Sequence, residues 1–209
     1  MLHMRKLFSC LVLASSSLLH AGGPHVVAGS TYFDPAAMGQ PVRWAGGQLS
    51  YYVDQGPLSA TVSHTQAVRM VDSAAALWSA VPTAAVALTD KGTLAEDVSG
   101  LNALASGSSL VQPADVAPAA TGYPLAVIFD IDGGVIDALL GSGASDPLSC
   151  NSNAVLAWTD NVRSDATVAH AVIVINGLCT GTANRLQMVN FLLERAFGNV
   201  LGLGYSQVY

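Results

Sequence analysis

The residue types and spacing that bear most directly on chemistry lie near the end of the chain. Arg195 and Asn199 are four positions apart, so on a helix their side chains share one face, and Tyr205 follows a turn that Gly202 and Gly204 predict. Histidines at these three positions would hold a zinc ion. A guanidinium, however, has no lone pair to donate, an amide oxygen suits hard cations better, and one phenolate does not hold zinc alone. The stretch has the spacing of a metal site without zinc-binding atoms.

This stretch, Arg195–Ser206, resembles the zinc-binding signature of the metzincin metallopeptidases, H-E-x-G-H-x-x-G-x-G-H-S, most closely that of the secreted matrixin-like group. The residues that shape the backbone in this signature are all present, namely Gly198, Gly202, Gly204 and Ser206. Arg195, Asn199 and Tyr205 stand at the positions of the three zinc-binding histidines. Ala196 stands at the position of the general-base glutamate, so no positioned base remains there to activate a metal-bound water.

The resemblance implies a secreted, metallopeptidase-like domain that has lost zinc and catalysis and is retained as a binding or structural module. No catalytic residue, metal ligand or cofactor is expected at the degenerate positions, and the partner is expected to be an unidentified protein or peptide. The alternative is an active zinc metallopeptidase whose ligands lie elsewhere. The remaining histidines that could supply them are widely spaced in the sequence: His25, His64 and His170.

The resemblance covers about residues 41–206 and implies an α/β (α+β) fold, in which a twisted mixed sheet has two long helices packed against it. Matrixin-like domains begin with a strand and then a long helix with a tryptophan near its end, and Trp78 matches this tryptophan. In metzincins a methionine-containing turn and another helix follow the third histidine. Because this sequence stops at Tyr209, we expect a metzincin-like domain over residues 41–209 that is truncated at its C-terminal end.

Hydrophobic patterns predict the elements that position these residues. Ser63 and Gln66 form a capping box that predicts a helix reaching about Val81, and a second long helix is predicted over Asn184–Leu201. Residues 22–40 are expected to be an irregular lead-in. The other predictions are strands over Gln48–Val53, Ala84–Leu88, Leu125–Phe129 and Ala166–Ile175, a hairpin through Asp132–Gly134 into Val135–Leu140, and a long Ala/Ser/Gly/Pro-rich loop over about 91–122.

A second stretch, Ala126–Gly133, resembles the first motif of haloacid-dehalogenase-type phosphohydrolases. That resemblance implies that Asp130 is a nucleophile and Asp132 an acid/base, with Mg²⁺ as cofactor. The motif normally opens its domain, whereas here it lies past the middle of the chain, and Gly134 replaces the usual Thr or Val. We therefore favour the simpler interpretation, in which a buried strand leads into an Asp-Gly turn.

Three carboxylates in this region could instead form a structural calcium site, since matrixin-type domains often carry calcium. They are Asp130, Asp132 and Asp137, and their spacing does not meet the EF-hand pattern.

Composition and charge restrict the classes of partner. Of the 209 residues, 51% are apolar and 11% are charged, which is typical of a folded domain rather than a disordered chain. Residues 1–21 have the basic N-terminal part, the apolar segment and the small residue before the cleavage site that are typical of a secretory signal peptide. Removal of this segment leaves six basic and 14 acidic residues, a net charge of −8. This balance disfavours nucleic acids and anionic membranes, and no later apolar stretch is long enough for membrane insertion.

Cysteine usage agrees with export. Cys10 lies in the signal segment, so Cys150 and Cys179 remain as an even pair. We expect a disulfide between them, because an oxidising compartment favours it, and the alternative is two buried free thiols.

Overall fold

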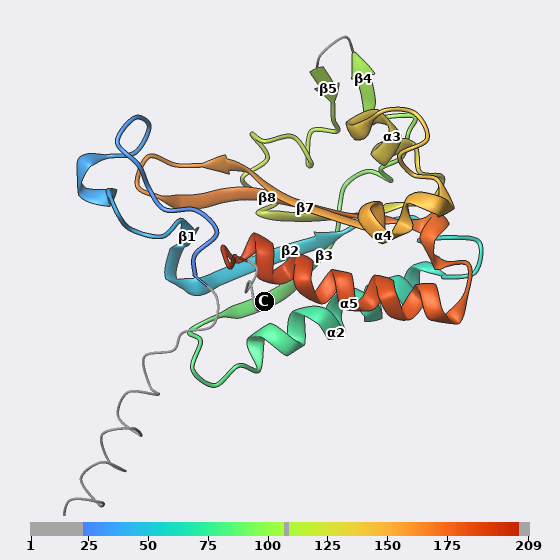
Figure 1. Cartoon of the computed structure of the whole chain (residues 1–209), viewed down its shortest axis with the longest axis horizontal. Coiled ribbons are helices and arrows are strands. Elements are labelled where there is room, and N and C mark those ends of the chain that lie inside the picture. Colours follow the sequence, from blue (N-terminus) through green and yellow to red (C-terminus); the bar gives the residue numbers. More distant parts are fainter. Residues whose placement is uncertain (1–22, 107–108, 205–209) are drawn as a thin grey trace, which may run out of the picture.

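The computed structural model describes residues 23–106 and 109–204 and has the expected mixed α/β architecture (Figure 1). A six-stranded sheet lies at the centre, with two long helices side by side on one face. Its strands are β1 (Arg43–Trp44), β2 (Gln48–Val53), β3 (Ala87–Thr93), β6 (Leu125–Asp130), β7 (Val155–Val162) and β8 (Thr167–Asn176). The helices are α2 (His64–Ser79), α3 (Gly134–Leu140), α4 (Cys150–Asn153) and α5 (Ala183–Val200). A separate hairpin consists of β4 (Leu104–Ser106) and β5 (Ser109–Val111).

The sheet is mostly parallel. Strands β3, β2, β6 and β8 lie in that order and run parallel, while β7 pairs antiparallel with β8 at the edge of the sheet. The short β1 pairs in parallel with the first residues of β8. Helix α2 makes the crossover that the parallel pair β2 and β3 requires. Helix α5 follows β8 after the short turn Gly177–Thr180, and it packs along β7.

The central strands are buried on both faces. All six residues of β6 are buried, and so are the last nine of β8, because α2 and α5 cover one face while α3 and the segment before β6 cover the other. Parallel strands that are covered on both faces read as continuous apolar runs, which explains the pattern Leu125–Phe129. The first core contains Phe129 and Phe197, and the second contains Ile128 and Val174.

Two tryptophans from the first half of the chain hold helix α5. The indole N–H of Trp78 on α2 donates to the carbonyl of Glu194 at 2.8 Å, and that of Trp44 donates to the carbonyl of Val200 at 2.7 Å. The Trp78 ring also lies against Gly198, where an added Cβ would be 2.6 Å from the ring carbon Cζ2. Helices α2 and α5 can therefore approach this closely only with glycine at position 198.

Three buried polar side chains anchor loops at the carboxyl ends of the parallel strands. Asp54 after β2 accepts hydrogen bonds from backbone N–H groups of Gln55, Val98 and Phe129. At the ends of β6 and β8, Asp130 and Asn176 hold the loops that follow or face them. These contacts satisfy buried groups that would otherwise destabilise the fold.

One local prediction was wrong, and one strand was missed. The expected hairpin over Val135–Leu140 is helix α3, because Gly133 adopts a positive φ of 77° and the Asp130 carboxylate accepts the N–H groups of Val135 and Ile136 at the helix start. The antiparallel strand β7 was not predicted at all, since its residues are only half-buried and do not alternate.

The bounds of three other predicted elements can be compared with the structure. The strand expected over Ala84–Leu88 is β3, which begins at Ala87 and continues to Thr93. The predicted loop over about 91–122 includes the hairpin of β4 and β5, and several of its apolar residues, among them Leu94 and Val116, are buried in the second core. The capping box at Ser63 is present in α2.

The disulfide between Cys150 and Cys179 is confirmed, with 5.6 Å between the two Cα atoms. It joins α4 to the turn before α5, and both residues are buried. Within the described ranges, no helix combines the length and apolar character needed to cross a membrane.

Substitution of Gly198 by alanine should destabilise the protein by about 1–3 kcal/mol, because the new Cβ overlaps the Trp78 ring. The measurement is the free energy of unfolding in urea. Gly181→Ala is the matched control, since Gly181 has φ −65° and open space around its Cα. That control should be neutral or stabilising by up to about 1 kcal/mol. The cost of Gly198→Ala should shrink in a Trp78→Phe background, which lacks the clashing carbon; an unchanged cost would show that the two residues do not meet.

Asp54 should make stability fall as the pH rises. Burial raises the pKa of Asp54 to about 7, even though hydrogen bonds from Val98 and Phe129 act in the opposite direction. The unfolded state therefore ionises first, near pH 4. The stability given by the protonated carboxyl group is fully present below about pH 4 and is lost as the pH rises to about 7.

The comparison that isolates this effect is wild type against Asp54→Asn in urea unfolding at a series of pH values. The free energy of unfolding of wild type minus that of Asp54→Asn should decrease by on the order of 2–3 kcal/mol between pH 5 and 8. Asp165→Asn is the control: hydrogen bonds from Thr167 lower the pKa of the exposed Asp165, so its carboxyl group is ionised in both states above about pH 5, and its difference from wild type should stay constant over this range. A wild-type advantage that stays constant or grows with pH would contradict the assignment for Asp54.

Candidate functional site at the end of the last helix

Helix α5 ends in a turn that directs the chain back towards the sheet. Gly202 has a φ of 91°. Its N–H donates to the carbonyl of Asn199 at 2.9 Å, and the N–H of Leu203 donates to the carbonyl of Gly198 at 3.0 Å, which is the Schellman pattern. A Cβ at Gly202 would also lie 2.7 Å from the carbonyl oxygen of Val42. Both conformation and space therefore require glycine at this position.

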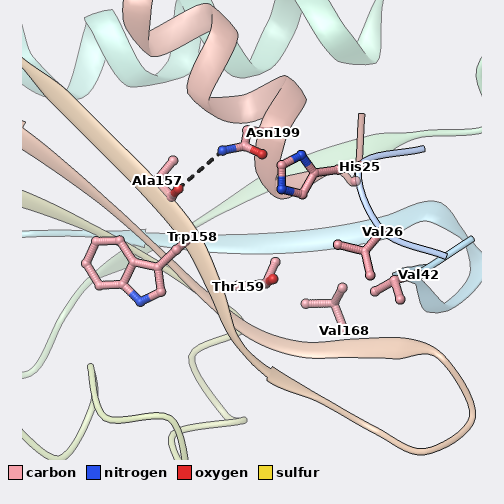
Figure 2. Close-up of a pocket in the computed structure, with 9 residues that line it drawn as sticks. His25, Val26, Val42, Ala157, Trp158, Thr159, Val168 and Asn199 are labelled. Atoms are coloured by element: carbon pink, nitrogen blue, oxygen red, sulfur yellow. Dashed lines mark hydrogen bonds between the residues drawn. The ribbon is translucent and has the colours of Figure 1, made fainter. Parts of the chain in front are cut away.

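The lead-in segment packs against this turn. The N–H of His25 donates to the carbonyl of Gly202 at 2.7 Å, and the N–H of Gly204 donates to the carbonyl of Gly23 at 2.9 Å. Figure 2 shows the imidazole of His25 beside the amide of Asn199. The sequence predicts only an irregular lead-in here, and no sequence pattern indicates that His25 reaches the end of α5.

The three degenerate positions on α5 have different surroundings. Arg195 is exposed, and its guanidinium lies over the ring of Phe191, 5.9 Å from the centroid. Ala196 is buried against the sheet. Asn199 is half-buried, and its Nδ2 group donates to the carbonyl of Ala157 on β7 at 3.2 Å (Figure 2). The helix and the edge strand are thereby joined directly at the site.

Three hollows meet around Asn199. The first, of about 200 Å³, lies between β7 and the lead-in and has His25 and Thr159 in its lining (Figure 2). The second, of about 390 Å³, lies over α5 between Phe191 and Leu203. The third, of about 340 Å³, lies between α4, the start of β7 and α5, and we call it the Arg195 hollow. The first and third hollows therefore lie beside β7, whereas the second lies beside α5 alone.

Strand β7 forms one edge of the sheet. Within the described residues, β8 is the only strand that pairs with it. The N–H of Ala171 donates to the carbonyl of Pro124, which precedes β6, so alternate residues of β8 from Ala171 onwards direct their backbone groups away from β7. Their partners Val155, Ala157 and Thr159 form non-hydrogen-bonded pairs, whose N–H and C=O groups point out of the sheet. The hydrogen bond that the Ala157 carbonyl accepts from α5 agrees with this direction.

The residues at this site do not fit a zinc ion. Arg195 has no lone pair and Ala196 has no donor atom, while the amide of Asn199 is directed at β7. His25 brings one imidazole to the site. Across residues 23–106 and 109–204, no group of three or more His, Cys, Asp or Glu side chains could hold a metal ion. The last two residues of the signature, Tyr205 and Ser206, lie outside the described residues.

The three carboxylates considered for calcium and for phosphoryl chemistry each hold their own loop. Asp130 is fully buried, and burial raises its pKa, although both of its oxygens accept N–H groups at the start of α3. Asp132 accepts the N–H of Gly134, and hydrogen bonds from Ser145 and Gly143 lower the pKa of Asp137. This arrangement matches a strand leading into an Asp-Gly turn.

The remaining candidates lie away from the end of α5. His64 contacts the carbonyl of Asp54 through Nε2 at 2.9 Å. His170 is fully buried in β8, with its Nδ1 2.6 Å from Asp160 Oδ1, whereas its Nε2 has no partner among the described residues. Glu194 lines a hollow on the α2 side of α5, away from the site.

Comparison with protein-family models, with curated proteins and with solved structures gave no match for this chain.

Proposed function

We propose that this chain is a secreted, metzincin-like domain that has lost zinc and catalysis and serves as a binding module. Its ligand is an extended segment of another polypeptide, which adds a strand to the outer edge of β7. The disulfide between Cys150 and Cys179 supports an oxidising, extracytoplasmic location.

The order of the elements supports the metzincin-like part of this proposal. After the two-residue β1, the domain continues with strand β2 and helix α2, which carries Trp78 in its last turn. Strand β8 precedes α5, and α5 ends in the glycine-dependent turn at Gly202. Each of these features agrees with what the resemblance implies.

The chemistry of the replaced residues supports the loss of catalysis. A permanent cation at position 195 repels a metal ion, and Ala196 has no group that could take a proton from water. Asn199 forms a contact with Ala157 that tethers the helix to β7 instead. The same end of α5 therefore has a packing role that needs no metal.

The free edge of β7 is the observation that carries the binding role. Backbone groups at Val155 and Thr159 point outwards and offer donors and acceptors to an added strand, whereas the outward carbonyl of Ala157 already accepts from Asn199. The hollows beside them provide room for the side chains of such a ligand. Main-chain hydrogen bonds supply affinity in this mode of recognition, and the hollows supply selectivity.

Histidines at the three ligand positions should restore zinc binding if the frame of the metal site persists. The variant Arg195→His/Asn199→His/Tyr205→His should bind one zinc ion per chain and unfold at a higher temperature with zinc than without it. The wild type and a control with glutamine at the same three positions should show neither effect. Stoichiometric zinc in purified wild-type protein, together with chelator-sensitive proteolysis, would overturn the proposal and support an active metallopeptidase.

Strand addition should be visible in the backbone amides of β7. A short blocked peptide of alternating threonine and valine, titrated into nitrogen-15-labelled protein, should shift the amide signals of Val155, Ala157 and Thr159 most. The amides of Leu156 and Trp158, which face β8, should respond less. The N-methylated form of the same peptide should cause no shift, because it lacks the donors. Equal shifts with both peptides, or shifts confined to another surface, would contradict binding at this edge.

A further inference from the structure

The side chains of β7 form two sets with different surroundings. Val155 and Ala157 pack against the first core, on the face of the sheet that α5 covers. Leu156 and Trp158 pack against the second core, on the opposite face. Figure 2 accordingly shows the Trp158 ring across β7 from Asn199. The side chains of a strand added to this edge alternate in the same way, so one set of them must lie beside Leu156 and Trp158.

Trp158 is the last member of a row of side chains that crosses the sheet on the second-core face. It is paired with Val172 on β8, which is paired in turn with Ala126 on β6. Ala126 is paired with Tyr52 on β2. The inner members Val172 and Ala126 are fully buried, whereas Trp158 is half-buried. Within the described residues, the Trp158 ring therefore has a cross-strand neighbour on the β8 side only.

An aromatic contact completes the same row at its other end. The ring of Tyr52 packs edge-to-face against that of Tyr123, with 4.7 Å between the ring centroids. Among residues 23–106 and 109–204, Trp158 has no equivalent ring contact, and its indole N–H makes no hydrogen bond. Cross-strand pairs of aromatic residues stabilise a sheet, and aromatic rings gain more from such contacts than from area burial alone. An aromatic ring is therefore the side chain that best fits the open side of Trp158.

The α5 face of the same edge favours a different kind of side chain. The two hollows that lie beside β7 on this face have polar groups in their linings. His25 and Thr159 line the first hollow, and Asn151 and Ser152 line the Arg195 hollow. The chemistry of the two faces therefore determines which set of ligand side chains lies on each of them.

We propose that the strand added to β7 carries an aromatic side chain that packs against Trp158, while its side chains on the α5 face are polar. This inference rests on the proposed function and names the ligand class of the same site: an extended segment in which aromatic and polar residues alternate. Trp158 is the one aromatic residue of β7, and it thereby becomes the determinant of specificity at this edge.

The test uses two blocked peptides in which threonine alternates with phenylalanine or with alanine. Dissociation constants are obtained from the amide shifts of Val155 and Thr159 in nitrogen-15-labelled protein. The Phe peptide should bind about tenfold more tightly than the Ala peptide. It should also shift the indole N–H signal of Trp158, and nuclear Overhauser effects should connect its ring protons to this indole.

Substitution of Trp158 separates the ring contact from binding at the edge. Trp158→Thr should remove the preference for Phe while the Ala peptide binds as it does to wild type, because threonine is also well suited to a strand. Trp158→Phe should retain most of the preference, since an aromatic ring remains. Phe191→Ala is the matched control: Phe191 is an exposed aromatic residue on α5, and its replacement should leave both affinities unchanged.

The outcomes distinguish the two proposals. The aromatic contact is wrong, while strand addition stands, if the Phe and Ala peptides bind wild type equally or if the preference for Phe survives in Trp158→Thr. Overhauser effects that place the peptide rings on the α5 face would have the same consequence. If neither peptide shifts the amides of Val155 and Thr159, the proposed function fails, and the aromatic contact fails with it.

Discussion

The close approach of the Trp78 indole to the backbone at Gly198 is the contact on which the rest of this architecture depends. It joins α2 to α5, and the indole N–H donates to the Glu194 carbonyl within α5. Trp44 makes the same kind of contact at Val200, so two segments from the N-terminal part of the chain hold α5 at two points. Each such hydrogen bond contributes about 1 kcal/mol, and packing of the ring adds more. The position of α5 then determines where its final turn and the hollows around Asn199 lie.

The carboxyl ends of the parallel strands illustrate why the candidate site lies elsewhere. Ligands commonly bind in the crevice beyond these ends in open α/β sheets. Here Asp54, Asp130 and Asn176 occupy that region and are bonded to the protein's own loops. Because these buried polar groups already have partners, a ligand there would have to displace backbone contacts. Strand β7 differs, since half of its backbone groups point outwards, and the sheet is therefore open to a ligand at its edge rather than at its strand ends.

The sequence predicts the fold well where local and tertiary preferences agree. Strand β2, the capping box of α2 and the long helix α5 carry strong periodicity and terminal signals, and their observed bounds lie close to the predicted ones. Helix α3 was missed because its start is held by the buried carboxylate of Asp130 at the end of β6, a contact that the Asp-Gly-Gly turn signal does not reveal. The approach of His25 to Asn199 is a contact between the two ends of the chain, and no local pattern encodes such a contact. Sequence reasoning thus finds the helix of the candidate site but neither its edge strand nor its lead-in.

The residues that match the metzincin signature have structural reasons to be glycine that do not involve a metal. Position 198 must accommodate the Trp78 ring, and position 202 must adopt a positive φ next to the carbonyl of Val42. Replacement at either position would disturb the packing of α5, whether or not zinc was ever bound. Arg195 is under no such constraint, because its side chain is exposed, and Asn199 contacts the edge of the sheet through its side-chain amide. A fold that no longer needs a metal would therefore keep its glycines and change its ligands, and the glycine pattern alone says nothing about whether zinc binds.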